Sequence, residues 1–300
     1  CLVGSHFYAY NTVDLGNTTG WNIQSRPALD LYWVNGQGDW ADSSHWSVSS
    51  GGVPGACIPS PLDNVFFDAN SFIGKADTVF TSHARIMCHD MTWIDNTGRH
   101  VFYAGIGGNC RIYGSLLFSD SMYNAYGGAF IFLSDTTGET ITSNGKVFHN
   151  DVRFRHALGG WTVTDDFVIS GALSKLELVL GSLSMPGLNI TIPSFSSSHK
   201  TNKFLDIRGS DITLNFGNWN LVSDSTELLA DSSMIRFTTS YGMMRNTGGD
   251  TLSFHNVWFS ESGGYNDLTS TQVTCRFNLV SFAGNANING NNIYDTLFLT

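Results

Sequence analysis

Three short stretches decide the fold of this chain: FHNVWF at residues 254–259, FNLVSF at residues 277–282 and YDTLFL at residues 294–299. The second and third echo the first at offsets of 277 − 254 = 23 and 294 − 277 = 17 residues. Spacings of roughly 17 to 25 residues, with several short strands in each period, are typical of solenoid proteins. One such coil has too little apolar surface to fold alone, so the repeat predicts stacked coils around a continuous apolar core.

Apolar and polar side chains alternate along the chain from residue 63 onward, and helical periodicity is almost absent. LELVL at residues 176–180, FHNDVRFRH at 148–156 and DITLNF at 211–216 each predict a short strand with one dry face. These stretches predict the following inward-facing side chains: Leu176, Leu178, Leu180, Phe148, Val152, Phe154, Ile212, Leu214 and Phe216. Gly, Asn, Ser and Asp separate them, as expected for strands of about four to six residues.

These features predict an all-β protein, and we expect a right-handed parallel β-helix, the solenoid architecture of pectin-lyase-like proteins. An antiparallel sandwich or barrel also uses many short strands and stays open as the alternative. Such folds usually join their strands by tight turns such as Asn-Gly. The pairs Asn35-Gly36, Asn144-Gly145 and Asn289-Gly290 do not recur at regular intervals, which favours the solenoid.

The composition excludes one class of partner. Only 13% of the 300 residues are charged, about half the share in an average soluble domain, and 25 Asp and Glu outnumber 15 Lys and Arg. With a net charge of −10 and no Lys/Arg cluster, the chain lacks the basic footprint that nucleic-acid binding requires. No stretch approaches the about eighteen apolar residues of a membrane span. A surface of Ser, Thr, Asn and Gly is common on secreted β-proteins.

The two ends of the sequence predict a piece of a longer chain. It begins at Cys1 without a methionine or a signal sequence, and it ends in NIYDTLFLT, which has the pattern of a strand without a polar tail. We therefore expect a processed or excised segment. A lipid-carrying cysteine of a bacterial lipoprotein is a further interpretation of Cys1.

The five cysteines contain no CxxC pair, so the sequence predicts no zinc site. If the protein is secreted, one or two disulfides are expected. Cys57 lies in a Pro-rich loop that must be fixed to the first strands, and we predict that it pairs with Cys88. The alternative, in which all five thiols are free and buried, stays open.

Three tryptophans, Trp33, Trp40 and Trp46, fall within fourteen residues of a segment rich in glycine and proline. The end of a solenoid exposes its core and an unpaired backbone edge, and both favour aggregation. Large aromatic rings would cover such a core, and proline cannot extend the strand ladder. We therefore predict that residues 32–62 form an aromatic, Pro-rich N-terminal cap. A platform on which a ligand stacks is the other interpretation.

The sequence also resembles a known family. The pattern is YWVNGQGDWADSSHWS, SGG and CIPSPLDNVFFDANSF in this order, followed by CHDMTW and IYGSLLF. It is similar to the repeating β-helix units of very large bacterial surface adhesins, among them the gliding-motility adhesin of Bacteroidetes, which is exported by the type IX secretion system. The resemblance is strongest over residues 11–118 and continues more weakly to residue 300.

The resemblance implies an extracellular cell-surface protein that acts in adhesion, surface attachment or gliding motility and has no catalytic residue. Residues 1–31 would be the end of a preceding repeat unit or a linker, 32–62 the cap of the next unit, and 63–300 its coils, truncated at the C-terminal end. The implied partners are polysaccharide or other surface ligands, neighbouring repeat units of the same chain, and the gliding or secretion machinery, reached through other parts of the parent chain.

Enzymes that cleave polysaccharides also use this architecture, so a catalytic site has to be considered. His149, Asp151, Arg153 and Arg155 alternate along one predicted strand, whose outward face would offer a base, an acid and two carboxylate-binding guanidinium groups. A solvated strand face with weak ion pairs explains the same pattern. The sequence contains no GxSxG, HExxH, P-loop, GxGxxG or EF-hand motif. We therefore expect a non-enzymatic protein, with a carbohydrate-active β-helix enzyme or a glycan-binding module as the alternative.

Two weaker kinds of binding site remain. Asp63 and Asp68 flank the stretch DNVFFD and could hold calcium with loop carbonyl oxygens, although turn-forming Asp residues give the same pattern. No cofactor other than this calcium is predicted. Trp258 could stack on a sugar from the outer face, and Arg153 and Arg155 could bind the carboxylates of an acidic sugar.

Overall fold

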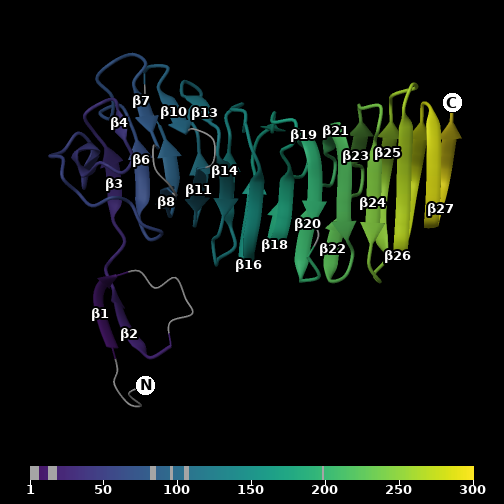
Figure 1. Ribbon diagram of the computed structural model, residues 1–300, viewed down its shortest axis with the longest axis horizontal. Helices are drawn as coiled ribbons and strands as arrows, with labels where there is room; N and C mark the ends of the chain where they lie inside the picture. Colours follow the sequence, from purple (N-terminus) through teal and green to yellow (C-terminus); the bar gives the residue numbers. More distant parts are fainter. Residues whose placement is uncertain (1–6, 13–18, 82–85, 95–96, 105–107, 198) are drawn as a thin grey trace.

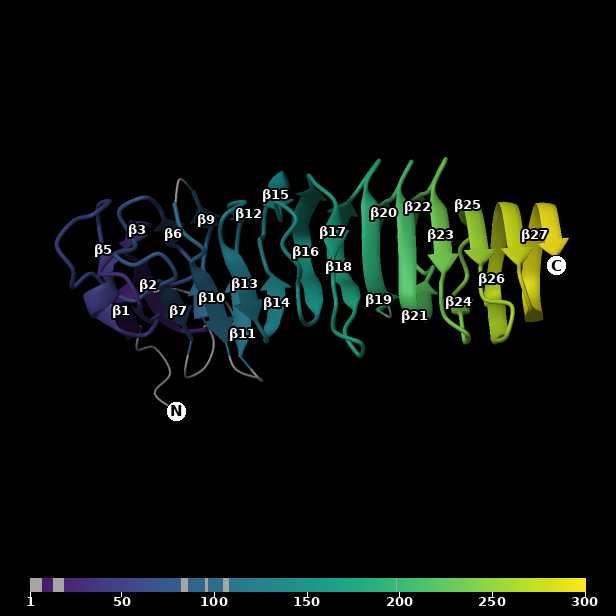
Figure 2. The same cartoon turned by 90° about the horizontal axis from the view of Figure 1, so that it is seen from above.

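The structure is a computed structural model of the chain, and it describes residues 7–12, 19–81, 86–94, 97–104, 108–197 and 199–300. These residues form an all-β parallel solenoid of about nine turns, which runs along the length of the molecule (Figures 1 and 2). The parallel solenoid predicted from the repeat is therefore confirmed. The one helical element described is a 3-10 turn at Ser43–His45, and the described residues include no helix that is long and apolar enough to cross a membrane.

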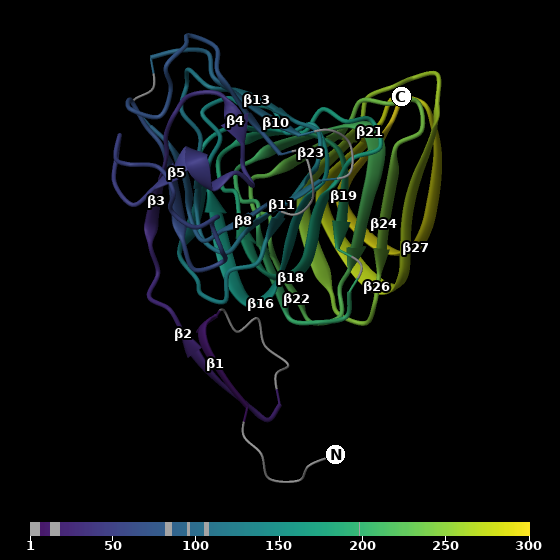
Figure 3. The ribbon, with the colours of Figure 1, turned by 60° about the vertical axis from the view of Figure 1, so that its left-hand side comes forward.

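The N-terminal coils use short strands. Four of them form a sheet of their own: β4 (Gly38–Asp39), β7 (Thr78–Phe80), β10 (Val101–Ala104) and β13 (Tyr123–Tyr126). The others belong to the large sheet that follows the solenoid: β3 (Asp30–Trp33), β5 (Trp46–Ser47), β6 (Asn64–Phe67), β8 (Ile86–Cys88), β9 (Met91–Trp93), β11 (Asn109–Ile112), β12 (Leu116–Leu117), β14 (Ala129–Phe132) and β15 (Glu139–Thr142). Apart from the coils, β1 (Phe7–Thr12) and β2 (Trp21–Ser25) pair in parallel with each other (Figure 3).

The C-terminal coils use longer strands, several of which bend around a corner of the coil. They continue the large sheet: β16 (Val152–Val163), β17 (Phe167–Val168), β18 (Leu176–Ser184), β19 (Asn189–Ser197), β20 (Lys203–Asp206), β21 (Asp211–Val222), β22 (Thr226–Leu229), β23 (Met234–Phe237), β24 (Met243–Thr247), β25 (Leu252–Phe259), β26 (Tyr265–Phe282) and β27 (Asn285–Leu299). Most of them pair in parallel with strands of the coils before and after, whereas β17 and β22 each pair with one strand only and β27 is the outermost strand (Figure 1).

The stacking of the last coils follows the echo in the sequence. Phe254 in β25 pairs with Phe277 in β26, which pairs with Tyr294 in β27, and Phe259 pairs with Phe282. The ring centroids of Phe259 and Phe282 lie 4.5 Å apart, and those of Phe277 and Tyr294 lie 5.5 Å apart. The sequence offsets are therefore coil lengths, and aromatic side chains stack on one another along the axis.

One alternation prediction fails at a corner of the coil. Phe216 is 52% exposed, although Ile212 and Leu214 of the same strand are buried. The chain turns at Gly217, whose φ of +105° is a backbone conformation that favours glycine. The turn changes the phase of the side-chain alternation, and Trp219 takes the next core position instead.

The other two predicted strands also differ from the prediction. Leu180 is half-buried rather than buried, because β18 turns at Gly181, whose φ is +86°. The stretch 148–156 is not one strand: β16 begins at Val152, whereas Phe148 forms an isolated parallel bridge to the next coil. Phe148 and Val152 are nevertheless buried, as predicted.

The apolar side chains form one continuous core from Leu31 to Phe282. Parallel pairing satisfies the backbone N–H and C=O groups between coils, and alternate side chains point outward. Outward side chains at paired positions of successive coils therefore form rows along the axis, in which neighbouring side chains are about 4.8 Å apart. A site on this surface can therefore combine residues two apart in one strand with residues about one coil length apart in the sequence.

Candidate functional site

Arg153 belongs to an ion-pair network between two neighbouring coils. Its guanidinium nitrogens lie 2.5 Å from a carboxylate oxygen of Asp151 and 3.4 Å from one of Glu177. Glu177 also accepts a hydrogen bond of 2.9 Å from the ammonium group of Lys175, and Asp151 accepts one from the backbone N–H of Lys175. The charge of Arg153 is thus neutralised within the protein, and the network stabilises the contact between coils.

The other two members of the predicted constellation do not join this network. The two ring nitrogens of His149 each lie 3.0 Å from a protein oxygen, Oγ of Ser170 and the backbone O of Asn124. Arg155 is exposed further along β16, and Asp151 is buried just before that strand begins. The prediction that all four side chains share one outward strand face is therefore wrong, because the chain bends between His149 and β16.

Trp258 lies on the outer face of β25, between the buried Val257 and Phe259, and is 37% exposed. Arg236, its partner in the preceding coil, places its guanidinium carbon 5.1 Å from the centre of the ring. The same guanidinium group donates a hydrogen bond of 2.8 Å to Asp211 Oδ1. One face of the ring therefore contacts a paired cation, which leaves only part of Trp258 for a sugar.

The carboxylate of Asp63 is paired with the guanidinium group of Arg26 and not placed to bind a calcium ion from solution. Its buried carboxylate forms an ion pair with Arg26 and accepts hydrogen bonds from the backbone N–H groups of Ser60 (2.8 Å) and Leu29 (3.0 Å). Burial raises the pKa of Asp63, but these donors outweigh it and hold the pKa below its ordinary value. Asp68 lies at the other end of β6, and within the described ranges no three His, Cys, Asp or Glu side chains gather as a metal site. The two carboxylates therefore do not form the calcium site considered from the sequence.

Cys57 and Cys88 do not form the predicted disulfide. Both are free thiols: Cys57 is exposed in the loop before β6, whereas Cys88 is buried in the core from β8. The pairing fails because the alternation of β8 turns Cys88 inward. Cys110 and Cys275 are also free and buried, and burial raises the pKa of all three buried thiols. Cys1 lies outside the described residues.

The three tryptophans of the segment 32–62 are buried against one another. Trp33, Trp40 and Trp46 are each at most 3% exposed. The ring centroids of Trp33 and Trp46 lie 5.1 Å apart and those of Trp40 and Trp46 lie 4.9 Å apart, both edge to face. β3 and β5 carry two of them in the one antiparallel pairing among the described strands. Buried rings cannot stack on a ligand, so the structure favours packing over the ligand platform.

Sequence reasoning missed a shallow groove on the outer surface of the N-terminal coils. The groove has a volume of about 540 Å³ and is lined by Arg99, Tyr123, Lys146, Asp120 and Ser121, among others. The guanidinium carbon of Arg99 lies 4.6 Å from the centre of the Tyr123 ring. The ammonium group of Lys146 donates a hydrogen bond of 2.6 Å to the backbone O of Asp120. The signal in the sequence is the spacing of Arg99, Tyr123 and Lys146, which follow one another at about one coil length.

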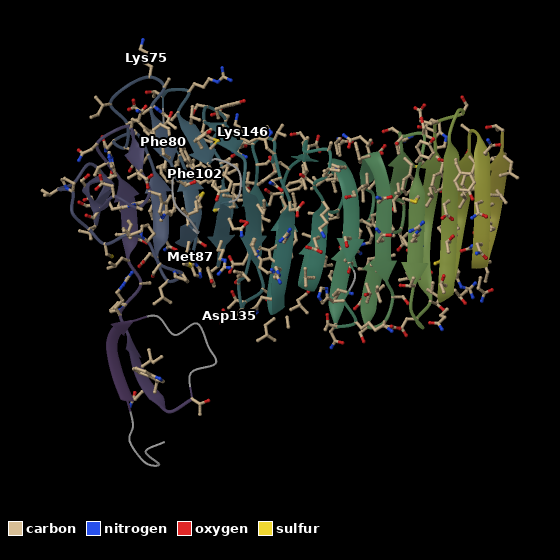
Figure 4. All side chains as sticks on the ribbon, in the orientation of Figure 1. Lys75, Phe80, Met87, Phe102, Asp135 and Lys146 are labelled. Atoms are coloured by element: carbon tan, nitrogen blue, oxygen red, sulfur yellow. The ribbon has the colours of Figure 1, made fainter. Side chains whose placement is uncertain are left out.

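Two further aromatic side chains lie on the same four-stranded sheet. Tyr103 of β10 is 45% exposed, and its ring centroid lies 6.1 Å from that of Phe80, its half-buried partner in β7. Tyr123 of β13 is 42% exposed and pairs with Val101 of β10. Phe80 and Lys146 both lie in the upper part of the N-terminal coils in Figure 4. This sheet therefore presents exposed rings, of which Tyr123 lies against Arg99.

A second groove, of about 490 Å³, lies between C-terminal coils and is lined in part by Lys203, Glu227 and Asp250. Lys203 is buried, and burial lowers the pKa of its ammonium group to about 8 against the opposing effect of the nearby Asp224 carboxylate. The ammonium group donates a hydrogen bond to the backbone O of His199. Lys203 is therefore engaged within its own coil.

A comparison with protein-family models, with curated proteins and with solved structures finds no match for this chain.

Proposed function

We propose that this chain is a non-catalytic segment of a large, secreted cell-surface adhesin that acts in surface attachment or gliding motility. The observation that carries the proposal is the in-register stacking of parallel coils from the first to the last strand of the solenoid. The resemblance of residues 11–118 to the repeat units of such adhesins supports it.

The stacking gives the mechanical property that an adhesive filament needs. Most inner strands are hydrogen-bonded to a coil on each side, so a force along the rod acts on many hydrogen bonds at once. Rupture then has to begin at an end of the rod, where a strand lacks a second neighbour. A stiff segment of this kind would transmit force between a cell and a surface.

The outer surface fits adhesion through many weak contacts. Only 13% of the residues are charged, and a surface rich in Ser, Thr and Asn offers hydrogen bonds to the hydroxyl groups of polysaccharides. Individually weak contacts become strong when many copies act together, since each bound contact raises the effective concentration of the next. Repetition along a filament would supply those copies.

Two finer features belong to the same proposal: a right-handed coil, and a capping role for residues 32–62. The burial of Trp33, Trp40 and Trp46 supports the capping role, as does the contact of Trp40 with Phe67 of β6. Neighbouring repeat units of the same chain would precede residue 32 and follow the last coil. Contacts with the gliding or secretion machinery would be made by other parts of the parent chain.

A carbohydrate-active enzyme is the alternative function. The pairing of Asp151 with Arg153 and of Glu177 with Lys175 argues against it, because both carboxylates are already neutralised by cations. We expect a reducing-end assay with uronate polymers to give no product from the parent or from Arg153→Ala. Product release that this substitution abolishes would establish the enzyme instead.

A calcium-dependent binding module is a third class. Because Asp63 is paired with Arg26, we expect EDTA to change the melting temperature by less than about 1 °C. A larger decrease that added calcium reverses would show that an ion contributes to the fold.

Adhesion under flow tests the proposal directly. Beads coated with the purified chain should be retained on polysaccharide-coated surfaces, and retention should rise steeply with coating density because the contacts add. Beads coated with the heat-unfolded chain at equal density are the control. Equal retention of the two kinds of bead on every surface would contradict an adhesive role.

A further inference from the structure

We propose that the groove around Arg99, Tyr123 and Lys146 binds an acidic polysaccharide whose sugars carry carboxylate groups. The inference rests on the proposed adhesive function and names the ligand class for one of its contacts. Three kinds of observation lead to it: the state of the two cations, the exposed aromatic rings, and the charge of the rest of the chain.

Both cations of the groove could meet an external anion, although Lys146 already donates a hydrogen bond to the backbone O of Asp120, which also lines the groove. In the part of the chain that the structure describes, neither Arg99 nor Lys146 forms an ion pair, whereas Arg153, Arg208 and Arg236 all do. The guanidinium group of Arg99 lies over the Tyr123 ring, which holds a planar, five-donor group in one orientation. Such a group recognises a carboxylate through two parallel hydrogen bonds.

The aromatic rings supply the second half of a sugar-binding surface. Tyr123 lines the groove and is 42% exposed, with Arg99 over one face of its ring. Tyr103 lies outside the groove on the same sheet, is 45% exposed and has Phe80 beside it. The C–H face of a sugar ring packs on an aromatic ring, while its substituents reach polar groups at the rim. A uronic acid carries both an apolar face and a carboxylate, so it matches rings beside cations better than a neutral sugar does.

The charge of the chain selects among polyanions. The net charge of −10 repels a densely charged polymer, and nucleic acid carries one phosphate per about 3.4 Å of each strand. A polyuronate carries at most one carboxylate per sugar, and Arg99 and Lys146, about two coil lengths apart in the sequence, offer two cations in one groove. The groove therefore favours a sparsely charged chain with apolar sugar faces.

Binding to immobilised oligouronates tests the inference with matched variants. Arg99→Gln combined with Lys146→Gln removes both charges of the groove and should weaken binding by about tenfold or more. Tyr123→Ala should weaken binding to oligouronates several-fold without changing the net charge. Lys200→Gln combined with Arg245→Gln removes two exposed charges elsewhere on the solenoid and should leave the affinity within about twofold.

The melting temperature of each variant shows that it is folded, and salt and competitors identify the ligand. Binding by the parent should weaken as salt rises, since exposed charges are screened. If both double variants lost the same affinity for oligouronates, the effect would come from the net charge and not from the groove, and the inference would be overturned. It would also be overturned by a parent that binds no oligouronate, or by equal binding of polyglutamate or single-stranded DNA.

The adhesion assay separates failure of this site from failure of the adhesive function. If the Arg99→Gln, Lys146→Gln variant is retained like the parent on surfaces coated with polyuronate, the groove is not the contact and only the present inference fails. If oligouronate binding depends on Arg99 while parent beads are never retained under flow, the site stands and the adhesive function fails.

Discussion

The two ends of the solenoid differ in what covers their last core residues. At the N-terminal end the three tryptophans of the segment 32–62 are buried. At the C-terminal end, Leu297 and Leu299 of β27 stand in the same inward rows as Val280 and Phe282 of β26. Val280 and Phe282 are fully buried, whereas Leu297 is 38% exposed and Leu299 is 64% exposed.

The difference shows that an inward position in a solenoid is buried only when a neighbour on each side covers it. Alternation within a strand decides which side chains point inward, and burial then requires the next layer. In the proposed cap, the buried rings of residues 32–62 would supply this layer instead of a regular coil. The stability of the rod should therefore depend strongly on that segment and weakly on the side chains of β27.

The largest expected effect comes from removing a ring of the buried end. Trp46→Ala deletes a fully buried side chain that contacts Trp33 and Trp40, and we expect it to lower the free energy of unfolding by about 3–5 kcal/mol. Leu299→Ala at the open end should lower it by less than about 1 kcal/mol, because most of that side chain is already in water. Urea unfolding measures both values. Similar losses in the two variants would show that the ends are equivalent.

A smaller loss of stability is expected from replacing Gly181 or Gly290 with alanine, because both lie at corners of the coil where a Cβ atom has too little space. A Cβ atom on Gly181 would lie 2.4 Å from the backbone O of His156, and one on Gly290 would lie 1.7 Å from that of Ser270. Both glycines have positive φ. Gly181→Ala should lower the free energy of unfolding by about 2–4 kcal/mol, because coils on both sides hold the corner. Gly290→Ala should have less than half that effect, since β27 can move outward.

Gly187→Ala is the control for backbone strain alone. Its φ is +72°, and a Cβ atom there would have no heavy atom within 4 Å. We expect a loss of about 1 kcal/mol in urea unfolding, the part due to the left-handed conformation. A loss at Gly290 as large as that at Gly181 would mean that the outermost coil is as firmly held as an inner one.

The ion pair at the N-terminal end should make that end sensitive to acid. The pKa of Asp63 lies below its ordinary value, since burial is outweighed by Arg26 and the other donors, so its pairing stabilises the fold above the unfolded pKa of about 3.9. The contribution is lost as the pH falls through the lower, folded pKa. Asp63→Asn should lower the free energy of unfolding by about 1–3 kcal/mol at pH 7. Thermal unfolding from pH 7 to pH 3 should show this difference shrinking below about pH 4, and a constant difference would exclude the carboxylate charge as its cause.

The fold could be predicted from the sequence because coil spacing and alternation are both properties of the linear chain. The pairing of Phe254, Phe277 and Tyr294 follows from one repeated pattern at the length of a coil. Alternation from Ile212 and Leu214 places Phe216 inward, but the coil turns at the next residue, Gly217, and the inward side changes there. Corners therefore limit prediction more than strands do.

The candidate site could not be predicted for a different reason. Arg99, Tyr123 and Lys146 become neighbours only when the lengths of two successive coils are known, and loops make these lengths vary in the N-terminal half. The constellation that the sequence did suggest was taken from one stretch, 148–156. Side chains close together in a strand pair with each other and with the next coil, as Arg153 does with Asp151 and Glu177.

The smallest effect, on the labelling rates of thiols, compares the two ends without altering the protein. Cys57 is exposed and should react with a thiol reagent at once, whereas Cys110 and Cys275 are buried, which raises the pKa of both thiols and leaves little thiolate. These two should react only when the coils around them open. Cys275 in β26 is covered on one side by β27 alone, so we expect it to react about tenfold faster than Cys110, as mass spectrometry of the labelled peptides would show. Equal rates would mean that all coils open together. The two ends would then have the same local stability, although they differ in burial.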